Sequence, residues 1–351
     1  MKKEIKLNDP KHIFVIAEAG SNWKVGSYKK DIERATKLIK VAANSGSDAI
    51  KFQTYNPKTV YVPNAGKSKY LRKSGVDKNI FEIFQKYSMP HKMLKDLSII
   101  CKKEKILFMS TPFSVDDAIE VNKFVKIHKI AAFEINHVRL LEYLASTKKP
   151  IIISTGASSS SDIDYAVKLL KKKGVKKICL LQTTSKYPAP IKSLNLSVIP
   201  FLKSEYQLPV GLSDHSLNPI LAPILSIGLG ATVIEKHFTM NKSLSGPDHS
   251  FALDPTELHL MIKSIRHADL AKGSGIKKIL PEEEELRRFA TRSLQATKSI
   301  KQGDVLHEGL NFDILRPGKN SRGSEVRYIF EIEGKSATKN YEVGEGITES
   351  N

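Results

Sequence analysis

Two histidines end short apolar segments in the second half of the chain and could bind a metal ion. His215 ends the segment Val210-Gly-Leu-Ser-Asp-His215, and His237 ends the segment Val233-Ile-Glu-Lys-His237. Their spacing of 22 residues matches about one strand, loop, helix and loop. In a barrel of alternating strands and helices, this period brings both imidazoles to one rim. With Glu235 and Asp248 nearby, the pair predicts a site for Mn2+ or Zn2+. Histidines that only cap or fill a core are the alternative.

Eight short apolar segments predict the strands that would carry such a rim. They are residues 13–17, 49–53, 106–109, 127–130, 151–154, 178–181, 209–212 and 233–235. Helical patterns follow them, most clearly over 31–43, 162–173 and 255–271, and a long loop is expected after the second strand up to Pro90. Eight strand–helix units in about 260 residues favour a (β/α)8 TIM barrel. An open doubly wound sheet is the competitor, but no Gly-x-Gly-x-x-Gly motif follows any strand.

Polar or ionisable side chains stand at the end of nearly every predicted strand, where a barrel places its active site. Lys51 and Gln53 are two residues apart and point to the same side of their strand. Ser154, Thr155 and Gly156 precede a helix, where hydroxyl and backbone N–H groups can hold a phosphate. Together with the histidines, these side chains predict a metal, a phosphorylated anion and an acid–base pair in one site. The other polar or ionisable residues at or just after the predicted strand ends are Glu18, Thr111, Lys129, Glu134, Ser185, Tyr187, Ser213, Glu235 and Lys236.

The remaining composition is typical of a soluble globular protein. No stretch reaches the ~20 apolar residues of a membrane helix, and residues 1–10 lack the apolar run of a signal peptide. Only two cysteines occur, Cys101 and Cys179, and neither has a metal-binding or redox spacing. We therefore expect a cytoplasmic protein with no membrane partner.

The net charge of +19 comes from lysine, which outnumbers arginine 46 to 10. The lysines are spread along the chain in short runs, whereas nucleic-acid-binding proteins concentrate charge on one face and rely on arginine. We therefore expect no nucleic-acid partner, and expect some steering of anionic substrates. A non-catalytic polyanion-binding protein is the alternative, and its binding should collapse with salt.

The sequence changes character after Gly273. An acidic run at 282–285 is followed by short segments separated by glycines. This pattern predicts a barrel domain over 1–275, a linker over 276–287 and a small β-rich domain with short helices over 288–351. A core of that size is marginal alone, so we expect the small domain to dock on a barrel or on a partner subunit.

The strand-end motifs, taken in order, resemble those of the sialic acid synthases. That family condenses phosphoenolpyruvate with an N-acetylated hexosamine to give a nonulosonic acid and phosphate. The resemblance covers essentially the whole chain, and the tail, including Arg316-Pro-Gly318, resembles the family's antifreeze-like (SAF) domain. The matching segments are Ala17-Glu-Ala-Gly-Ser-Asn22, Lys51-Phe-Gln-Thr-Tyr55, Ser110-Thr-Pro-Phe113, Ile152-Ile-Ser-Thr-Gly156, Tyr187-Pro-Ala-Pro190, Gly211-Leu-Ser-Asp-His215, Ile234-Glu-Lys-His-Phe238 and Gly246-Pro-Asp248.

The resemblance implies a role for each site residue. His215 and His237 would bind the metal, Mn2+ first and Mg2+ or Co2+ as alternatives, which polarises the sugar aldehyde. Glu134 would be the base for the attacking water, and Glu18 and Asp248 would hold sugar hydroxyls or the metal's water. The implied substrate-binding residues are Lys51, Gln53, Thr111, Lys129, Ser154, Ser185, Tyr187, Ser213 and Arg316.

The resemblance also implies a domain-exchanged homodimer and leaves the acceptor sugar open. Arg316 would reach into a neighbouring subunit's barrel and contact the N-acyl sugar. The expected acceptor is N-acetylmannosamine or a related N-acylated hexosamine. A 6-deoxy diacetamido hexose, giving legionaminic or pseudaminic acid, is the alternative: residues 132–136 lean towards it, whereas Glu18-Ala-Gly leans towards neuraminic or legionaminic acid.

Three positions depart from the family pattern. Trp23 replaces the usual histidine, and Ser185 stands where some members have asparagine. Ala132 replaces a serine whose hydroxyl would bind phosphate. The loss of that hydrogen bond predicts binding of phosphoenolpyruvate weakened by about tenfold.

A metal-free mechanism is a further alternative. Lys129 on a barrel strand could form a Schiff base, as in class I aldolases. This would leave His215 and His237 without a role, and borohydride trapping of pyruvate on Lys129 would support it.

Overall fold

The computed structural model describes residues 7–9, 11–62, 64–67 and 79–349. The chain divides into two compact units, Met1–Gly273 and Ser274–Asn351. The segment predicted as a linker contains the short helix η3 (Pro281–Glu283) and the first half of α12 (Glu284–Ala290), both in the second unit. Most of the N-terminal segment 1–10 lies outside the described residues.

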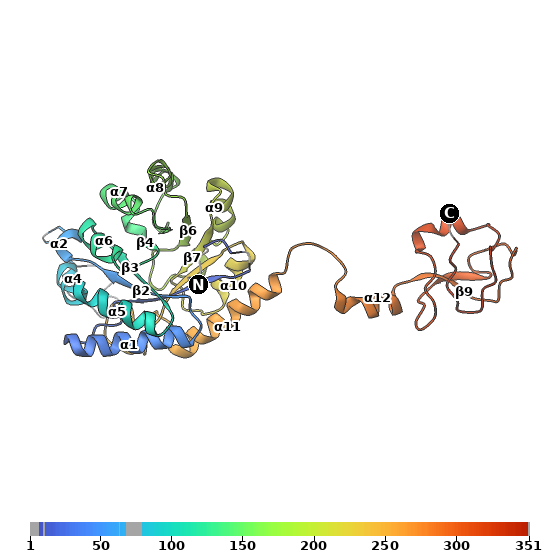
Figure 1. Ribbon diagram of the computed structural model, residues 1–351, viewed down its shortest axis with the longest axis horizontal. Helices are drawn as coiled ribbons and strands as arrows, with labels where there is room; N and C mark the ends of the chain where they lie inside the picture. The colour runs from blue at the N-terminus through green and yellow to red at the C-terminus, as the bar shows by residue number, and fades with distance from the viewer. Residues whose placement is uncertain (1–6, 10, 63, 68–78, 350–351) are drawn as a thin grey trace. The chain divides into compact units, whose positions relative to one another are not determined.

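Eight parallel strands form the first unit, and each overlaps one predicted strand. They hydrogen-bond in the order β3-β2-β1-β8-β7-β6-β5-β4. Strands β3 and β4, at the two ends of this order, also pack side by side, so the sheet curls into a nearly closed barrel (Figure 1). The predicted (β/α)8 barrel is confirmed. The strands are β1 (Phe14–Gly20), β2 (Ala49–Thr54), β3 (Leu107–Pro112), β4 (His128–Ile130), β5 (Ile151–Ser154), β6 (Ile178–Thr183), β7 (Val210–Asp214) and β8 (Val233–His237).

A helix follows each strand and packs on the outside of the barrel (Figure 1). Caps define where several of them begin: Ser159 with Asp162, and Asp254 with Glu257, form capping boxes at α8 and α11. No helix of the described residues is both long and apolar enough to cross a membrane. The helices are α1 (Tyr28–Asn44), α5 (His91–Lys103), α6 (Val115–Asn122), α7 (Val138–Ser146), α8 (Ser160–Lys172), α9 (Val198–Tyr206), α10 (Leu221–Gly228) and α11 (Pro255–Lys272).

The long loop predicted after β2 was wrong in part, because two helices interrupt it. They are α2 (Pro57–Val60) and α4 (Ile80–Tyr87). Helix α4 buries Ile80, Ile83 and Tyr87, which share one helical face, and the Asn79 side chain caps it by accepting from the Phe81 N–H. Residues 63 and 68–78 of this segment lie outside the described residues.

The barrel has two apolar layers because side chains alternate along each strand. On β1, Val15, Ala17 and Ala19 face the helices, whereas Phe14 and Ile16 belong to a cluster inside the barrel. The inner cluster fills the barrel towards the strand starts and leaves the strand ends for polar side chains. Its other members are Leu7, Ala49, Met109, Ile127, Ile152, Cys179, Leu181 and Val233.

The second unit has a core of its own around an antiparallel pair of strands. Strands β9 (Ser293–Ala296) and β10 (Phe312–Leu315) pair, and η4 (Val326–Tyr328) continues into α13 (Ile329–Ile332). This confirms the prediction of a small β-rich region with short helices. The buried side chains include Leu294, Leu306, Phe312, Tyr341 and Ile347.

Candidate active site

The predicted site residues on the strands occupy the inner face of the barrel. Glu18 lies two residues beyond Ile16 on β1, and Lys51 lies two residues beyond Ala49 on β2. Since Ile16 and Ala49 belong to the inner cluster, the polar side chains that follow them point inward as well. The same spacing holds for Thr111, Lys129, Ser154 and Glu235, each two residues beyond a member of the inner cluster.

Lys51 is the centre of a buried ionic network. Its Nζ forms an ion pair with Glu18, donates to Thr111 Oγ1 at 3.0 Å and lies 3.6 Å from Glu235 Oε1. Burial alone would lower the pKa of Lys51, but Glu18 and Glu235 raise it above its ordinary value. Lys51 is therefore a permanent cation in this site.

Lys129 lies on the other side of the same glutamate. Its Nζ is 3.7 Å from Glu235 Oε1 and donates to Ser154 Oγ at 2.6 Å. Ser213 donates to Glu235 Oε1 at 3.2 Å. Burial lowers the pKa of Lys129, and the nearby Lys51 lowers it further, although Glu235 opposes both effects. Glu235 thus lies between two lysines, and a substrate anion would add to the contacts of both amino groups.

The two histidines lie next to each other, with ring centroids 5.6 Å apart. His215 Nδ1 donates to the Thr184 carbonyl at 2.8 Å, which leaves Nε2 with a free lone pair. Burial lowers the pKa of His215 to about 4, and burial and the neighbouring cations lower that of His237 well below its ordinary range. Both rings are therefore neutral, the form that binds metals.

His215 and His237 are the residues that would hold a divalent metal. His237 Nδ1 is buried and has no hydrogen-bond partner among the described residues. No group of three or more His, Cys, Asp or Glu residues in the described part of the chain could hold a metal. With the two histidines as protein ligands, water or substrate oxygens would have to complete the coordination.

Aromatic rings enclose the histidine pair. Tyr187 stacks on His215 with a centroid distance of 4.1 Å, and Phe251 lies 5.1 Å from both Tyr187 and His237. Water is thereby excluded from one side of the imidazoles, which strengthens electrostatic interactions there.

Glu134 is a buried carboxylate that the short helix η1 (Ala132–Glu134) presents after β4. Only 8% of its surface is exposed, and its Oε2 has no hydrogen-bond partner among the described residues. Burial raises its pKa to about 7, although Lys129 partly offsets this effect. A carboxylate with this pKa can accept a proton near neutral pH.

Asp248 and Glu18 lie close together at the end of β1. Asp248 accepts from the Ser21 N–H at 3.1 Å and from Ser21 Oγ at 2.8 Å, and Gln53 Nε2 donates to Glu18 at 3.3 Å. A Cβ at Gly20, where φ is +52°, would lie 2.7 Å from Asp248 Oδ2, so glycine permits this approach. Burial raises the pKa of Asp248 and raises that of Glu18 to about 7.

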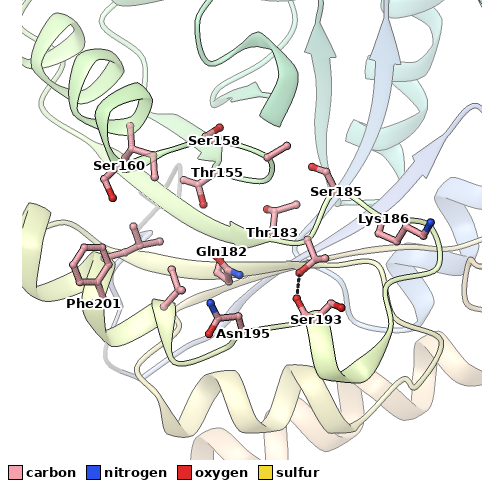
Figure 2. A pocket seen from close by; sticks show the side chains of 15 residues that line it. Thr155, Ser158, Ser160, Gln182, Thr183, Ser185, Lys186, Ser193, Asn195 and Phe201 are labelled. Carbon is pink, nitrogen blue, oxygen red and sulfur yellow. Dashed lines mark hydrogen bonds between the residues drawn. The ribbon is translucent and has the colours of Figure 1, made fainter. Parts of the chain in front are cut away.

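A pocket of about 440 Å3 adjoins the site between the β5–α8 and β6–α9 loops. Figure 2 shows Ser185 at its edge, among hydroxyl and amide side chains from both loops. A Cβ at Gly156 would lie 2.3 Å from Ser185 Oγ, so the glycine is needed for the loops to meet. Thr184 Oγ1 donates to the Ser193 carbonyl at 2.8 Å. Ser185 Oγ itself is buried without a hydrogen-bond partner among the described residues.

Two of the departures from the family pattern have structural consequences. Trp23 is 1% exposed and belongs to the apolar layer between strands and helices. Where the family usually has a histidine, this chain therefore has an apolar side chain packed in the core. Ala132 begins η1, two residues before Glu134, and adds no hydroxyl there.

Sequence reasoning missed the bridging position of Glu235, although it noted the residue at a strand end. It also missed three tyrosines from the segment between β2 and α5. Burial raises the pKa of all three, and the pKa is raised further by Asp248 at Tyr55 and Tyr87 and by Glu134 at Tyr61. The aromatic spacing of α4 was the signal that could have placed Tyr87. Arg316 is exposed on the second unit.

Comparison with known proteins decides the family. The NeuB family matches residues 38–277. The N,N'-diacetyllegionaminic acid synthase of Campylobacter jejuni is 39% identical over 343 residues, which cover 97% of this chain and 100% of that protein. This chain belongs to the NeuB family. The predicted resemblance to the sialic acid synthases is confirmed, as is the prediction of an enzyme.

Other relatives of this NeuB-family chain carry related names. A pseudaminic acid synthase of Campylobacter jejuni is 35% identical, with 98% of each chain covered. The human N-acetylneuraminate-9-phosphate synthase is 29% identical, with 96% of this chain and 91% of the relative covered. The crystal structure of an N-acetylneuraminic acid synthetase from Leptospira borgpetersenii in complex with citrate matches with a TM-score of 0.71 at 32% identity, covering 82% of this chain and 94% of that one.

Proposed function

We propose that this NeuB-family enzyme condenses phosphoenolpyruvate with the aldehyde of an N-acylated hexosamine, giving a nonulosonic acid and phosphate, and that the reaction needs a divalent metal. The names of the relatives support the product class. One observation carries the proposal: two buried lysines flank Glu235 beside two neutral histidines, inside one barrel.

The lysines would bind the anionic groups of phosphoenolpyruvate. Lys51 and Lys129 now interact with Glu18 and Glu235, and the carboxylate and phosphate of the substrate would add to these contacts. Thr111 and Ser154, which already accept from the two lysines, and Ser185 and Ser213 would supply hydroxyl donors.

The chemistry joins two carbons and releases phosphate. The C3 atom of phosphoenolpyruvate attacks the aldehyde carbon, whose oxygen takes a proton, and C2 becomes electron-deficient. Water adds to C2 and gives its proton to Glu134. The bond between C2 and the phosphate oxygen then breaks, and the C2 hydroxyl gives its proton to the leaving phosphate and becomes the keto group. A divalent cation on His215 and His237 would supply Lewis-acid polarisation of the aldehyde. Glu18 and Asp248 would orient the sugar hydroxyls.

For the acceptor we infer a 6-deoxy diacetamido hexose. The relatives at 39% and 35% identity are named legionaminic and pseudaminic acid synthases, whereas the N-acetylneuraminate-9-phosphate synthase is 29% identical. The segment 132–136 of the sequence leans in the same direction. N-acetylmannosamine stays the competing prediction.

Phosphate release from phosphoenolpyruvate tests the proposal. N-acetylmannosamine, its 6-phosphate and the 6-deoxy diacetamido hexoses are offered separately, with Mn2+ or with EDTA. We expect metal-dependent release with one diacetamido hexose. Release with EDTA would refute the metal requirement, and folded enzyme that is silent with every sugar would refute the function.

We expect Lys129→Met to raise the KM for phosphoenolpyruvate about 10- to 100-fold, because a charged hydrogen bond is removed. The KM for the sugar should change little, since Lys129 contacts Ser154 and Glu235 rather than the histidines. Steady-state kinetics with each substrate varied in turn measure both constants.

Lys123→Met is the matched control, because Lys123 is exposed and its ion pair is with the neighbouring Glu120. Its KM values should equal those of the wild type. A Lys129→Met variant that keeps metal but has no kcat at saturating substrate would instead favour the Schiff-base mechanism.

Mixing two inactive variants tests the domain-exchanged dimer. If Arg316 acts in the partner's barrel, an Arg316→Ala subunit and a Glu134→Ala subunit together form one intact site. Random pairing would then restore about a quarter of wild-type activity. No recovery in mixed dimers verified by mass spectrometry would rule out action across the interface.

A further inference from the structure

The second unit contains a pocket whose polar lining is dominated by arginine. Its volume is about 490 Å3. All the lining residues belong to this unit, so the pocket is defined without the barrel. They are Arg287, Thr291, Arg292, Arg322, Glu325, Val326 and Arg327.

Arginine is scarce in this chain except around this pocket. Six of the ten arginines lie between residues 287 and 327, against 46 lysines spread along the chain. A general basic surface would use lysine here as elsewhere. Arginine presents a planar fork of donors that matches phosphate or carboxylate oxygens in pairs, which lysine cannot do. The total charge of +19 conceals this local concentration.

The arginines come from three segments of the backbone. Arg287 is in the last turn of α12, and Arg292 precedes β9. Arg292 Nη1 donates to the Ile314 carbonyl at 2.7 Å, which ties it to β10. A Cβ at Gly323 would lie 2.0 Å from the Leu294 carbonyl oxygen, so the chain beside Arg322 is pressed against β9. Arg292 is thus fixed against β10, and the backbone beside Arg322 is fixed against β9.

The charges of the lining are not balanced. Four guanidinium groups face a single carboxylate, Glu325, which pairs with Arg327. Arg287 and Arg322 form no ion pair with any described residue. The acidic residues of the α12 first turn, Glu284 and Glu285, do not line the pocket. An uncompensated set of this kind attracts a multiply charged anion.

We propose that this pocket binds a small phosphate dianion, as inorganic phosphate or as a phosphate monoester. Under the proposed function, phosphoenolpyruvate is consumed and phosphate is released, so both sources of this group meet the enzyme. The site itself goes beyond the proposed function and does not depend on it.

Equilibrium dialysis of the full chain against labelled phosphate, and separately against phosphoenolpyruvate, tests the proposal at fixed ionic strength. Acetate serves as the arm without phosphate. In a Lys129→Met background, where the barrel site is weakened, one equivalent of phosphate should still bind. Adding Arg287→Gln and Arg322→Gln should weaken that binding by at least tenfold, since a charged hydrogen bond is lost with each change.

The matched control is Lys319→Gln with Lys335→Gln, which removes the same charge from exposed positions of the same unit. This pair should leave the affinity within twofold. Arg322→Lys keeps the charge but not the fork, and should weaken binding several-fold. This conservative variant keeps the test valid if the double arginine variant misfolds, and a circular dichroism spectrum shows whether each variant is folded.

Two results would overturn the proposal. One is phosphate binding that the arginine pair and the lysine pair weaken equally, which indicates a diffuse charge effect. The other is an absence of saturable binding in the Lys129→Met background. Neither depends on catalysis: an enzyme that releases no phosphate with any sugar could still bind it here, and an active enzyme could lack this site.

Discussion

Replacement of His215 by alanine is expected to lower kcat/KM by about 10³-fold, because a Lewis acid supplies several kcal/mol of transition-state stabilisation. The ring of His215 is held by the Thr184 carbonyl and lies 5.6 Å, centroid to centroid, from that of His237. Because no third protein ligand is present among the described residues, the variant would keep a single protein ligand, His237, for the metal. Titration calorimetry with Mn2+ and the phosphate-release assay, run side by side, measure the two losses.

His259→Ala is the control, since His259 is an exposed residue of α11. It should bind Mn2+ and react as the wild type does. A His215→Ala enzyme that recovers full activity after chelation and return of the metal would show that this histidine is not a ligand.

The barrel could be predicted because its signals are local. Each strand is a short apolar segment such as 151–154, and each helix has its own periodicity and cap, as Ser159 provides for α8. The alternation of side chains then placed Lys51 and Gln53 on one face. Helix α4 was missed although Ile80, Ile83 and Tyr87 are spaced for one helical face. The helical spacing was overlooked because α4 lies inside the long connection between β2 and α5.

The ionic network could not be predicted in the same way. Glu235 lies on β8, Lys51 on β2 and Lys129 on β4, and no two of these strands are neighbours in the sheet. Their side chains meet across the interior, so the contact depends on the tilt and stagger of the closed barrel. The sequence contains the residues, but the distances of 3.6 and 3.7 Å follow only from closure.

Burial is the second property that sequence reasoning could not supply. The resemblance assigned Glu134 the role of a base, yet an exposed glutamate would have a pKa too low for the task. In the structure its carboxylate is buried after β4, and burial raises the pKa to about 7. Burial also lowers the pKa of His215 and His237, so both histidines are neutral. In both cases the enclosing protein, and not the residue type, sets the protonation state.

Glu134→Gln is expected to lower kcat about 10²- to 10⁴-fold, the usual contribution of a positioned general base. The base works in its ionised form, so wild-type kcat should rise as the pH increases through about 7 and fall below it. Glutamine cannot titrate, so the acid limb of the profile should vanish. A pH–rate profile at saturating substrate measures both effects.

Two further variants make this prediction specific. Glu205→Gln, at an exposed position of α9, should reproduce the wild-type profile. Glu18 also has a pKa of about 7 because it is buried, so Glu18→Gln must be measured in parallel. If the acid limb persists in Glu134→Gln and disappears in Glu18→Gln, the proton acceptor is Glu18. The water would then be activated from the end of β1, beside Lys51 and Gln53, rather than from η1.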